Sequence, residues 1–319
     1  MDITEVVKKQ VFFQNLIKKR DENLLSNAIL FFCEDKFTSK IVLNLTALMI
    51  QYPMMFELFN ENSAEYKKIE NGSDLDTKVY PKNADKLLVS DSNEIVSESY
   101  VKPVNLPNKI FVLRNFDSST EEAQNKLLKV LEEPPKNVFF LLSAQSEDKV
   151  LSTIKSRCDK IYINAFSKED IQNFCQDTLA IILGNGFLGK TLELEKNENL
   201  KNVVRFAVSL FSEMKNSKQV VKFSKKFLDL KGEMQTILEV MSLCIEDMIK
   251  IKCESENLCK LTPFLQNLKD VEPEFSVWAL CEISKKIENL LEKIEFNANL
   301  TVSIDNFLLE ILEVKYLCK

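Results

Sequence analysis

Histidine is absent from the 319 residues, and this absence excludes more chemistry than any other feature of the composition. Without an imidazole the chain has no Ser-His or Cys-His nucleophile pair, no histidine general base and no histidine metal ligand. Most hydrolase mechanisms are thereby excluded. Glycine is also scarce, with five residues where an average usage of roughly 7% would give more than twenty. This scarcity favours helices over glycine-punctuated folds such as large β-barrels and dinucleotide-binding sheets.

The chain also lacks an excess of positive charge. Lysine and arginine number 42 against 48 acidic residues, which gives a formal net charge of −6 and an isoelectric point near 5.2. A protein whose affinity depends on neutralising phosphates is expected to be basic. Strong autonomous DNA binding is therefore disfavoured, and protein partners are favoured.

Targeting and membrane signals are missing as well. The N-terminus opens with acidic residues and has no basic segment leading into an apolar core, so no secretory signal is visible. The longest uncharged stretch, residues 41–56, is interrupted by polar residues and Pro53 and is too short to span a bilayer. We therefore expect a cytoplasmic protein without a membrane partner.

The eight cysteines form no CxxC pair, and Cys244 and Cys281 fall on apolar helical stripes. In a reducing compartment, cysteines in such positions are core or surface thiols. We therefore expect neither a disulfide framework nor a zinc site, and no other metal.

Hydrophobic periodicity divides the chain into an α/β half and a helical half. Short apolar runs typical of strands alternate with helical patterns in the first half, and the runs lie at residues 28–33, 109–113, 138–142 and 160–163. This alternation predicts a parallel sheet flanked by helices. Beyond residue 200 the apolar residues recur at helical spacing, so no sheet is expected there. Residues 57–108 are polar and irregular and receive no assignment.

The predicted organisation therefore has three parts. Residues 1–164 form an α/β domain, and residues 165–197 form a small helical domain interrupted by glycines. Residues 198–319 form an all-helical domain.

Residues 119–135 contain a helix with an unusual end. Ser119 and Glu122 have the spacing of a capping box, and Pro134 and Pro135 stop the helix. Two acids, Glu132 and Glu133, precede the prolines in the last turn, where the helix dipole disfavours anions by roughly 0.3 to 1 kcal/mol. Local stability does not explain these two acids. They are either solvated or part of an interface.

Three stretches carry a resemblance to a known family. They are Asn-Lys-Leu-Leu-Lys-Val-Leu-Glu-Glu-Pro-Pro at 125–135, Val-Phe-Phe-Leu-Leu at 138–142, and Ser156-Arg157-Cys158. In these stretches the sequence resembles the clamp-loader subunits of bacterial DNA polymerase III, which are AAA+ proteins of the gamma/tau and delta-prime type. A weaker match lies at residues 296–300, before the last helix. The resemblance implies that the three predicted parts are an AAA+-like domain, a lid and an oligomerising collar.

The resemblance places a nucleotide site after the first strand, where active members of the family have a P-loop. A P-loop needs glycines so that backbone N–H groups can surround the phosphates. Here residues 33–40 read Cys-Glu-Asp-Lys-Phe-Thr-Ser-Lys and contain no glycine. The degenerate loop offers Cys33, Ser39 and Lys40, and a single lysine cannot replace the missing backbone donors.

A second loss occurs after the strand at 109–113. Arg114 and Asn115 stand where an active family member carries the Mg²⁺-binding aspartate and the water-polarising glutamate. Together the two losses indicate the delta-prime type, which keeps the fold without binding ATP productively. The insert between Cys33 and Cys158 also lacks the four-cysteine zinc module of many relatives. No cofactor is expected.

Arg157, with Ser156 and Cys158, is the candidate catalytic residue. Taken by itself, Arg157 is a surface arginine that pairs with Asp159 or another acid. The resemblance implies instead an arginine finger, whose planar donor fork stabilises the γ-phosphate in the ATP site of a neighbouring subunit. In the same way, it makes Glu132, Glu133, Pro134 and Pro135 candidates for an interface.

A competing motif lies at residues 184–191, where Gly-Asn-Gly-Phe-Leu-Gly-Lys-Thr satisfies GxxxxGK[ST]. Taken alone, this segment predicts a P-loop ATPase that uses Lys190, and the apolar residues 179–183 before it resemble a strand. The polar sequence after it and the helical pattern ahead of it argue against that context. The ATPase remains an alternative hypothesis, as does a purely structural scaffold in which Arg157 is idle.

The resemblance implies a function within an assembly rather than independent enzyme activity. The partners implied are the clamp-loader gamma/tau and delta subunits, together with the sliding clamp and primed DNA reached through the assembly. Lysines at 218, 222, 225 and 226 share one helical face. Such a stripe is either a solvated face or a weak DNA contact.

Overall fold

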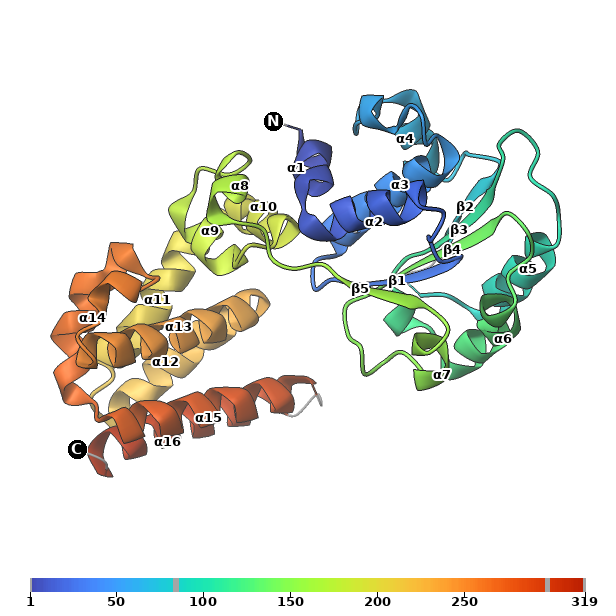
Figure 1. Ribbon diagram of the computed structural model, residues 1–319. Coiled ribbons are helices and arrows are strands. Elements are labelled where there is room, and N and C mark those ends of the chain that lie inside the picture. Colours follow the sequence, from blue (N-terminus) through green and yellow to red (C-terminus); the bar gives the residue numbers. More distant parts are fainter. Residues whose placement is uncertain (1, 83–85, 296–298, 318–319) are drawn as a thin grey trace. The chain divides into compact units, whose positions relative to one another are not determined.

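The computed structural model describes residues 2–82, 86–295 and 299–317 (Figure 1). Residues 296–298, which belong to the weaker family match, and Cys318 lie outside the described residues.

The chain forms two compact units. One consists of Met1–Phe174 and Gly186–Lys190, and the other of Cys175–Asn185 and Thr191–Lys319. The division into domains 1–164, 165–197 and 198–319 stays a prediction.

The first unit contains a five-stranded parallel sheet with the strand order β2-β3-β4-β1-β5. The strands are β1 (Ala28–Phe32), β2 (Thr77–Tyr80), β3 (Lys109–Leu113), β4 (Val138–Ala144) and β5 (Asp159–Tyr162). Because β1 and β3 are buried on both faces, they are continuous apolar runs without alternation. The predicted parallel sheet is confirmed, and no strand follows β5 within the described residues.

Helices cover both faces of this sheet (Figure 1). The helices of this unit are α1 (Ile3–Lys9), α2 (Val11–Asp21), α3 (Lys36–Gln51), α4 (Ala64–Glu70), α5 (Val89–Ser99), α6 (Glu121–Glu132), α7 (Ser152–Lys155) and α8 (Lys168–Gln172). Helices α2 and α3 lie on one face, and α5, α6 and α7 lie on the other. Ala28, Leu30 and Phe32 of β1 point into the core that packs against α5 and α6.

The structure differs from the sequence prediction in two places in this unit. Strand β2 lies in the unassigned stretch 57–108, because its sequence, Thr-Lys-Val-Tyr, contains a single aliphatic residue and forms no apolar run. The cap of α6 is Thr120, whose Oγ1 accepts the N–H of Ala123 at 3.2 Å, so the capping box at Ser119 was wrong. Ser119 instead donates its hydroxyl to the carbonyl of Phe116 and closes the preceding 3-10 turn.

The second unit is built from helices around a single core. Its elements are α9 (Thr178–Gly184), α11 (Leu200–Glu213), α12 (Ser217–Asp229), α13 (Met234–Lys252), α14 (Leu265–Val271), α15 (Val277–Glu295) and α16 (Leu300–Leu317), while α10 (Leu188–Lys196) contributes residues to both units. Phe206, Phe223 and Phe227 stack against one another and join α11 to α12. The predicted helical second half is confirmed.

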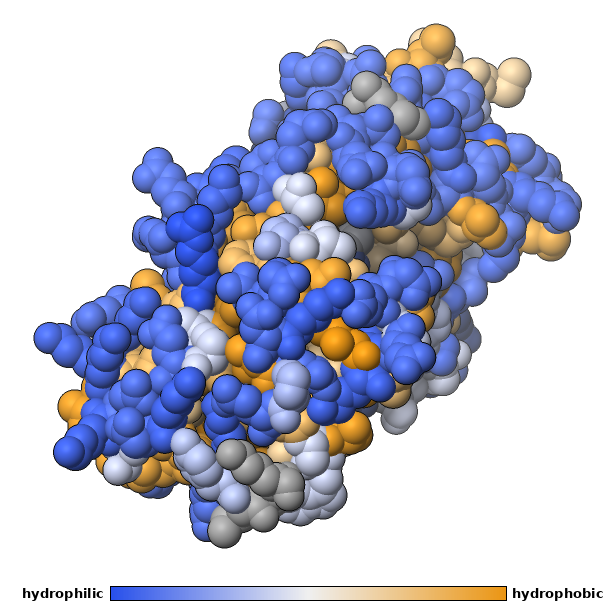
Figure 2. Space-filling view, turned by 90° about the vertical axis from the view of Figure 1, so that its left-hand side faces the viewer, coloured by the Kyte–Doolittle hydropathy of each residue, from blue (hydrophilic) through white to orange (hydrophobic). Residues whose placement is uncertain are grey.

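The surface is dominated by polar side chains. On the face drawn in Figure 2, hydrophobic residues appear only in small groups between hydrophilic ones. Among the described helices, none combines the length and the apolarity that crossing a bilayer requires.

Candidate functional site

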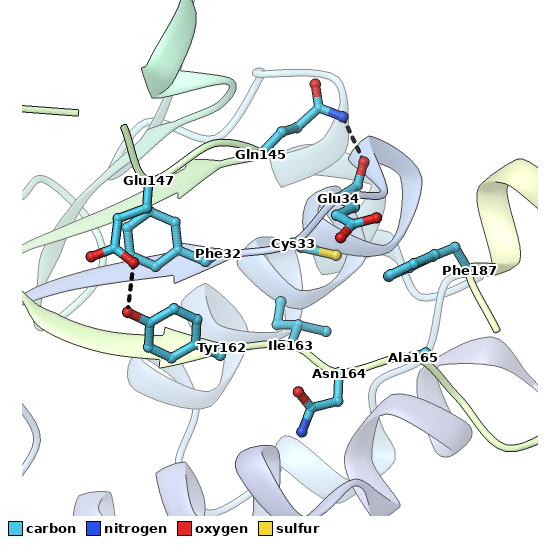
Figure 3. A pocket seen from close by; sticks show the side chains of 10 residues that line it. All are labelled: Phe32, Cys33, Glu34, Gln145, Glu147, Tyr162, Ile163, Asn164, Ala165 and Phe187. Atoms are coloured by element: carbon cyan, nitrogen blue, oxygen red, sulfur yellow. Dashed lines mark hydrogen bonds between the residues drawn. The ribbon is translucent and has the colours of Figure 1, made fainter. Parts of the chain in front are cut away.

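A pocket of about 310 Å³ lies at the carboxyl ends of strands β1, β4 and β5 (Figure 3). Cys33 and Glu34 follow β1, Gln145 and Glu147 follow β4, and Tyr162 ends β5. This edge of a parallel sheet is where open α/β folds bind their ligands.

The charged residues that line the pocket are both acidic. Glu147 accepts the Tyr162 hydroxyl at 2.9 Å, and this hydrogen bond raises the pKa of the tyrosine. Gln145 donates to the carbonyl oxygen of Glu34 at 2.5 Å, and the side chain of Phe187 points toward Cys33. Glu147 is paired with Lys155 at 3.7 Å and with Lys160 at 3.9 Å, and no lysine or arginine is among the lining residues, so the lining itself offers a phosphate no cation.

Beside this pocket, helix α3 begins at a buried carboxylate. Asp35 caps the helix by accepting the N–H of Phe37 at 3.0 Å and the hydroxyl of Thr38 at 2.5 Å. It also accepts the N–H of Gly189 at 2.7 Å. A helix N-terminus is a natural anion site, because its first N–H groups lack partners and its dipole end is positive. At the N-terminus of α3 the carboxylate of Asp35 occupies this anion site.

The three residues of the predicted degenerate loop do not converge on one point. Burial raises the pKa of the Cys33 thiol to about 12, and its sulfur donates to the carbonyl of Asp35. Ser39 donates its hydroxyl to the carbonyl of Lys36 at 3.0 Å. The Lys40 ammonium lies 2.7 Å from a carboxylate oxygen of Glu70.

Arg114 and Asn115 follow β3, as the sequence predicts. Nη2 of Arg114 donates to Asn44 at 3.1 Å, and burial lowers the pKa of this guanidinium. Its Nε is buried and has no hydrogen-bond partner among the described residues. Asn115 adopts the left-handed region at φ 50°, and its N–H donates to the hydroxyl of Ser143.

The structure brings Arg157 and Glu132 together. Nε and Nη2 of Arg157 donate to Oε2 of Glu132 at 3.0 and 2.7 Å, and Nη1 donates to the carbonyl of Thr153 at 2.9 Å. Their side chains are 29% and 59% exposed, so the pair lies at the surface. Two stretches that carried the family resemblance are thus in direct contact.

The partner of Arg157 is therefore an acid other than Asp159, whose carboxylate pairs with Lys19 at 2.6 Å. Ser156 donates its hydroxyl to the carbonyl of Thr153, and Cys158 is half-buried against the core. Burial, with the nearby charge of Asp159, raises the pKa of the Cys158 thiol to about 12.

Glu133 is exposed, and Pro134 and Pro135 are half-buried. Their assignment to an interface, together with that of Glu132, stays a prediction.

The GxxxxGKT segment does not follow a strand. Its preceding apolar residues form helix α9, which ends at Gly184, and Asn185 then adopts the left-handed region. The glycines serve close packing: a Cβ on Gly184 would lie 1.9 Å from the Thr191 hydroxyl, and one on Gly189 would lie 2.2 Å from Asp35. The strand-loop-helix context that a P-loop requires is absent from this part of the described chain.

The acids of the loop, Glu34 and Asp35, were visible in the sequence, but sequence reasoning missed Glu147 and the role of Asp35 as the cap of α3. The available signal was Asp35 itself, because an aspartate directly before a helical pattern is a preferred N-cap. The contact to Gly189 has no such signal, since it joins residues 154 positions apart.

Comparison with known proteins places this chain in a family. A family model described as "DNA polymerase III, delta subunit" matches residues 8–167. DNA polymerase III subunit gamma of Buchnera aphidicola (Schizaphis graminum) is 27% identical over 227 residues, covering 67% of this chain and 62% of that protein. Subunit delta' of Haemophilus influenzae is 43% identical over 70 residues, covering 22% of this chain and 20% of that protein.

These matches span less than two thirds of either relative. Among solved structures, a gamma subunit-related protein of Thermotoga maritima has a TM-score of 0.44 and 18% identity, with 98% of this chain and 100% of that chain covered. Because the family model matches half of the chain and includes every described strand of the sheet, the protein belongs to the DNA polymerase III delta subunit family of clamp-loader proteins.

Proposed function

We propose that this chain is a delta-prime clamp-loader subunit, which does not bind ATP productively and supplies Arg157 to the ATP site of a neighbouring subunit. The observation that carries the proposal is the Asp35 carboxylate at the N-terminus of α3. It fills the place where a phosphate would have to bind.

Electrostatics support the loss of nucleotide binding. A triphosphate entering this edge of the sheet meets Asp35 and Glu34, and Lys40 of the degenerate loop is paired with Glu70. Phosphate binding would require displacement of Asp35 from its hydrogen bonds. No cofactor is therefore assigned to this chain.

The surface position of Arg157 supports a role in trans. An exposed ion pair such as Arg157 with Glu132 contributes only about 0 to 1 kcal/mol. A neighbour's phosphate can thus replace Glu132 at little cost. Arginine suits this task because its rigid fork matches phosphate oxygens, and a finger supplied in trans accelerates hydrolysis by roughly 10³ to 10⁵.

The proposed setting is the cytoplasmic DNA polymerase III holoenzyme. In it, residues 1–164, 165–197 and 198–319 serve as a degenerate AAA+ domain, a lid and an oligomerising collar. The partners are the gamma/tau and delta subunits, with Glu132, Glu133, Pro134 and Pro135 at an interface. The assembly places the sliding clamp on primed DNA.

The test of the finger is reconstitution of the complex with wild-type, Arg157→Ala or Arg157→Lys chain, followed by measurement of ATP turnover and clamp loading on primed DNA. We expect Arg157→Ala to assemble normally and to lower turnover partially, since other sites keep their own fingers. Arg157→Lys should recover little, because an ammonium lacks the fork. Lys160→Ala, which removes an exposed cation three residues away, is the matched control.

Wild-type turnover from a fully assembled Arg157→Ala complex would leave the scaffold function, which the contact with Glu132 also fits. Failure to assemble would make Arg157 structural. Calorimetry of the isolated chain with Mg-ATP tests the other half of the proposal, and we expect no binding at micromolar concentrations. Tight binding that Lys190→Ala abolishes would instead establish the ATPase at residues 184–191.

A further inference from the structure

Helix α12 carries four lysines on one exposed face. Lys218, Lys222, Lys225 and Lys226, which we name the α12 lysine face, follow the spacing i, i+4, i+7 and i+8, and all four are exposed. Asp229, the last residue, is the one acid in the sequence of α12. The helix is therefore strongly cationic within a chain whose net charge is −6.

The lysines of the α12 lysine face have no acidic partner, and among the described residues of the helical unit Lys201, Lys215 and Lys231 share this property. Six exposed or half-buried lysines elsewhere in the unit form ion pairs, and they are Lys250, Lys252, Lys260, Lys269, Lys285 and Lys286. None of the four residues of the α12 lysine face forms an ion pair within the described part of the chain.

Two ammonium groups of the α12 lysine face lie over aromatic rings. The Lys226 ammonium lies 4.8 Å from the centroid of the Phe206 ring, and that of Lys222 lies 5.9 Å from the Phe223 ring. Arg205 is also exposed, and it directly precedes Phe206 in α11. The Lys226 ammonium thus lies over a ring of the neighbouring helix α11.

Local stability accounts for only part of this arrangement, since Lys226 lies in the last turn of α12, where a cation favours the helix dipole. Lys218 is the second residue of α12, and a cation in the first turn opposes the helix dipole. Like charges at i and i+4, as in Lys218 with Lys222 and Lys222 with Lys226, destabilise a helix further. A face that costs the helix stability and lacks internal partners fits an anionic partner outside the chain.

We infer that the α12 lysine face binds the phosphate backbone of duplex DNA. From Lys218 to Lys226 the helix rises about 12 Å, which spans three to four phosphates of one strand. Surfaces for single-stranded DNA add exposed aromatic rings on which bases stack, whereas Phe223 and Phe227, the aromatic residues of α12, are buried. A cationic surface without exposed aromatic rings therefore fits duplex DNA better than single-stranded DNA.

The inference rests on the proposed function in one respect: the proposed function is what brings the assembled protein close to DNA. Because the rest of the chain is acidic, the contact is local and dependent on salt, which agrees with the absence of an overall basic charge. It would add a backbone contact to the assembly without reading sequence.

The experiment measures fluorescence anisotropy of a labelled blunt duplex titrated with the full chain, without ATP, at several salt concentrations between about 50 and 200 mM. The test variant is Lys218→Gln with Lys222→Gln, Lys225→Gln and Lys226→Gln. The matched control replaces Lys260, Lys269, Lys285 and Lys286 by Gln, which changes the net charge equally. We expect the test variant to lose at least about tenfold in affinity at low salt and to flatten the salt slope by up to about 3.6, whereas the control keeps the wild-type slope.

Equal losses in the two variants would overturn the inference, because they would show an effect of net charge alone. The inference would also be overturned if a labelled single strand bound more tightly than the duplex. The same holds if polyglutamate displaced the labelled duplex as well as unlabelled duplex of equal total charge does. Circular dichroism checks folding, and the milder Lys218→Gln with Lys222→Gln should give about half of the slope change. Arg157→Ala should bind duplex like wild type even if the proposed finger fails, so the two proposals can fail separately.

Discussion

Replacement of Asp35 by alanine should destabilise the sheet-containing unit more than the loss of an ordinary helix cap. The side chain is buried and accepts three hydrogen bonds, from the N–H groups of Phe37 and Gly189 and from the Thr38 hydroxyl. Alanine removes all three and leaves the N–H of Gly189 without this acceptor.

The size of the effect follows from these contacts. Loss of the N-cap alone costs about 1 kcal/mol in the free energy of unfolding. The buried N–H of Gly189 left without a partner adds about 1 to 3 kcal/mol. We therefore expect a total of about 2 to 4 kcal/mol for Asp35→Ala.

Two further variants separate the cap from the contact with Gly189. Asp2 caps α1 by accepting the N–H of Thr4 at 2.9 Å, so Asp2→Ala should cost only about 1 kcal/mol. Asp35→Asn keeps only one acceptor oxygen. Because Oδ1 of Asp35 accepts from Phe37 and Oδ2 accepts from Thr38 and Gly189, the amide N–H₂ of asparagine must face a donor, and this variant should recover only part of the loss.

The assay is urea unfolding of the full chain, followed by far-UV circular dichroism and by fluorescence. The single tryptophan, Trp278, lies in the helical unit, so its fluorescence transition serves as an internal control that should move less than the transition of the other unit. If Asp35→Ala costs no more than Asp2→Ala, or if asparagine restores nothing, Asp35 does not hold the two segments together as argued.

Two other substitutions test the same unit. Gly189→Ala places a Cβ 2.2 Å from Asp35 and should cost about 1 to 3 kcal/mol, whereas Gly232→Ala, with no atom within 4 Å of its Cβ, should change stability by less than about 0.5 kcal/mol in the same urea assay. Burial by itself would raise the pKa of Asp76. The N–H groups of residues 104–106 donate hydrogen bonds to its carboxylate, and these bonds outweigh the effect of burial and hold the pKa below its usual value. The stability that Asp76 contributes is therefore present above the unfolded pKa of about 3.9 and is lost as the pH falls through the lower folded value. Asp76→Asn, whose amide N–H₂ would face these donors, should cost about 2 kcal/mol at pH 7 and progressively less as the pH falls below 4; a difference that does not vary with pH would contradict the assignment.

The sequence by itself determined the elements whose signals are local. The apolar runs of β1, β3 and β4 and the stripes of α13 and α15 predict the observed strands and helices, because burial on one or both sides leaves a periodic pattern in adjacent residues. The loss of glycine from residues 33–40 was visible for the same reason. Strand β2 was missed because it contains a single aliphatic residue, Val79, and so forms no apolar run.

Only the tertiary structure decided which side chains meet. Glu132 and Arg157 are 25 positions apart, and Asp35 and Gly189 are 154 apart. The same is true of the cationic face of α12, since a pattern shows which lysines share a face but not whether an acid from another helix neutralises them. Such contacts depend on how distant segments pack in the folded chain. The residues adjacent to a side chain in sequence do not specify which distant segment packs against it.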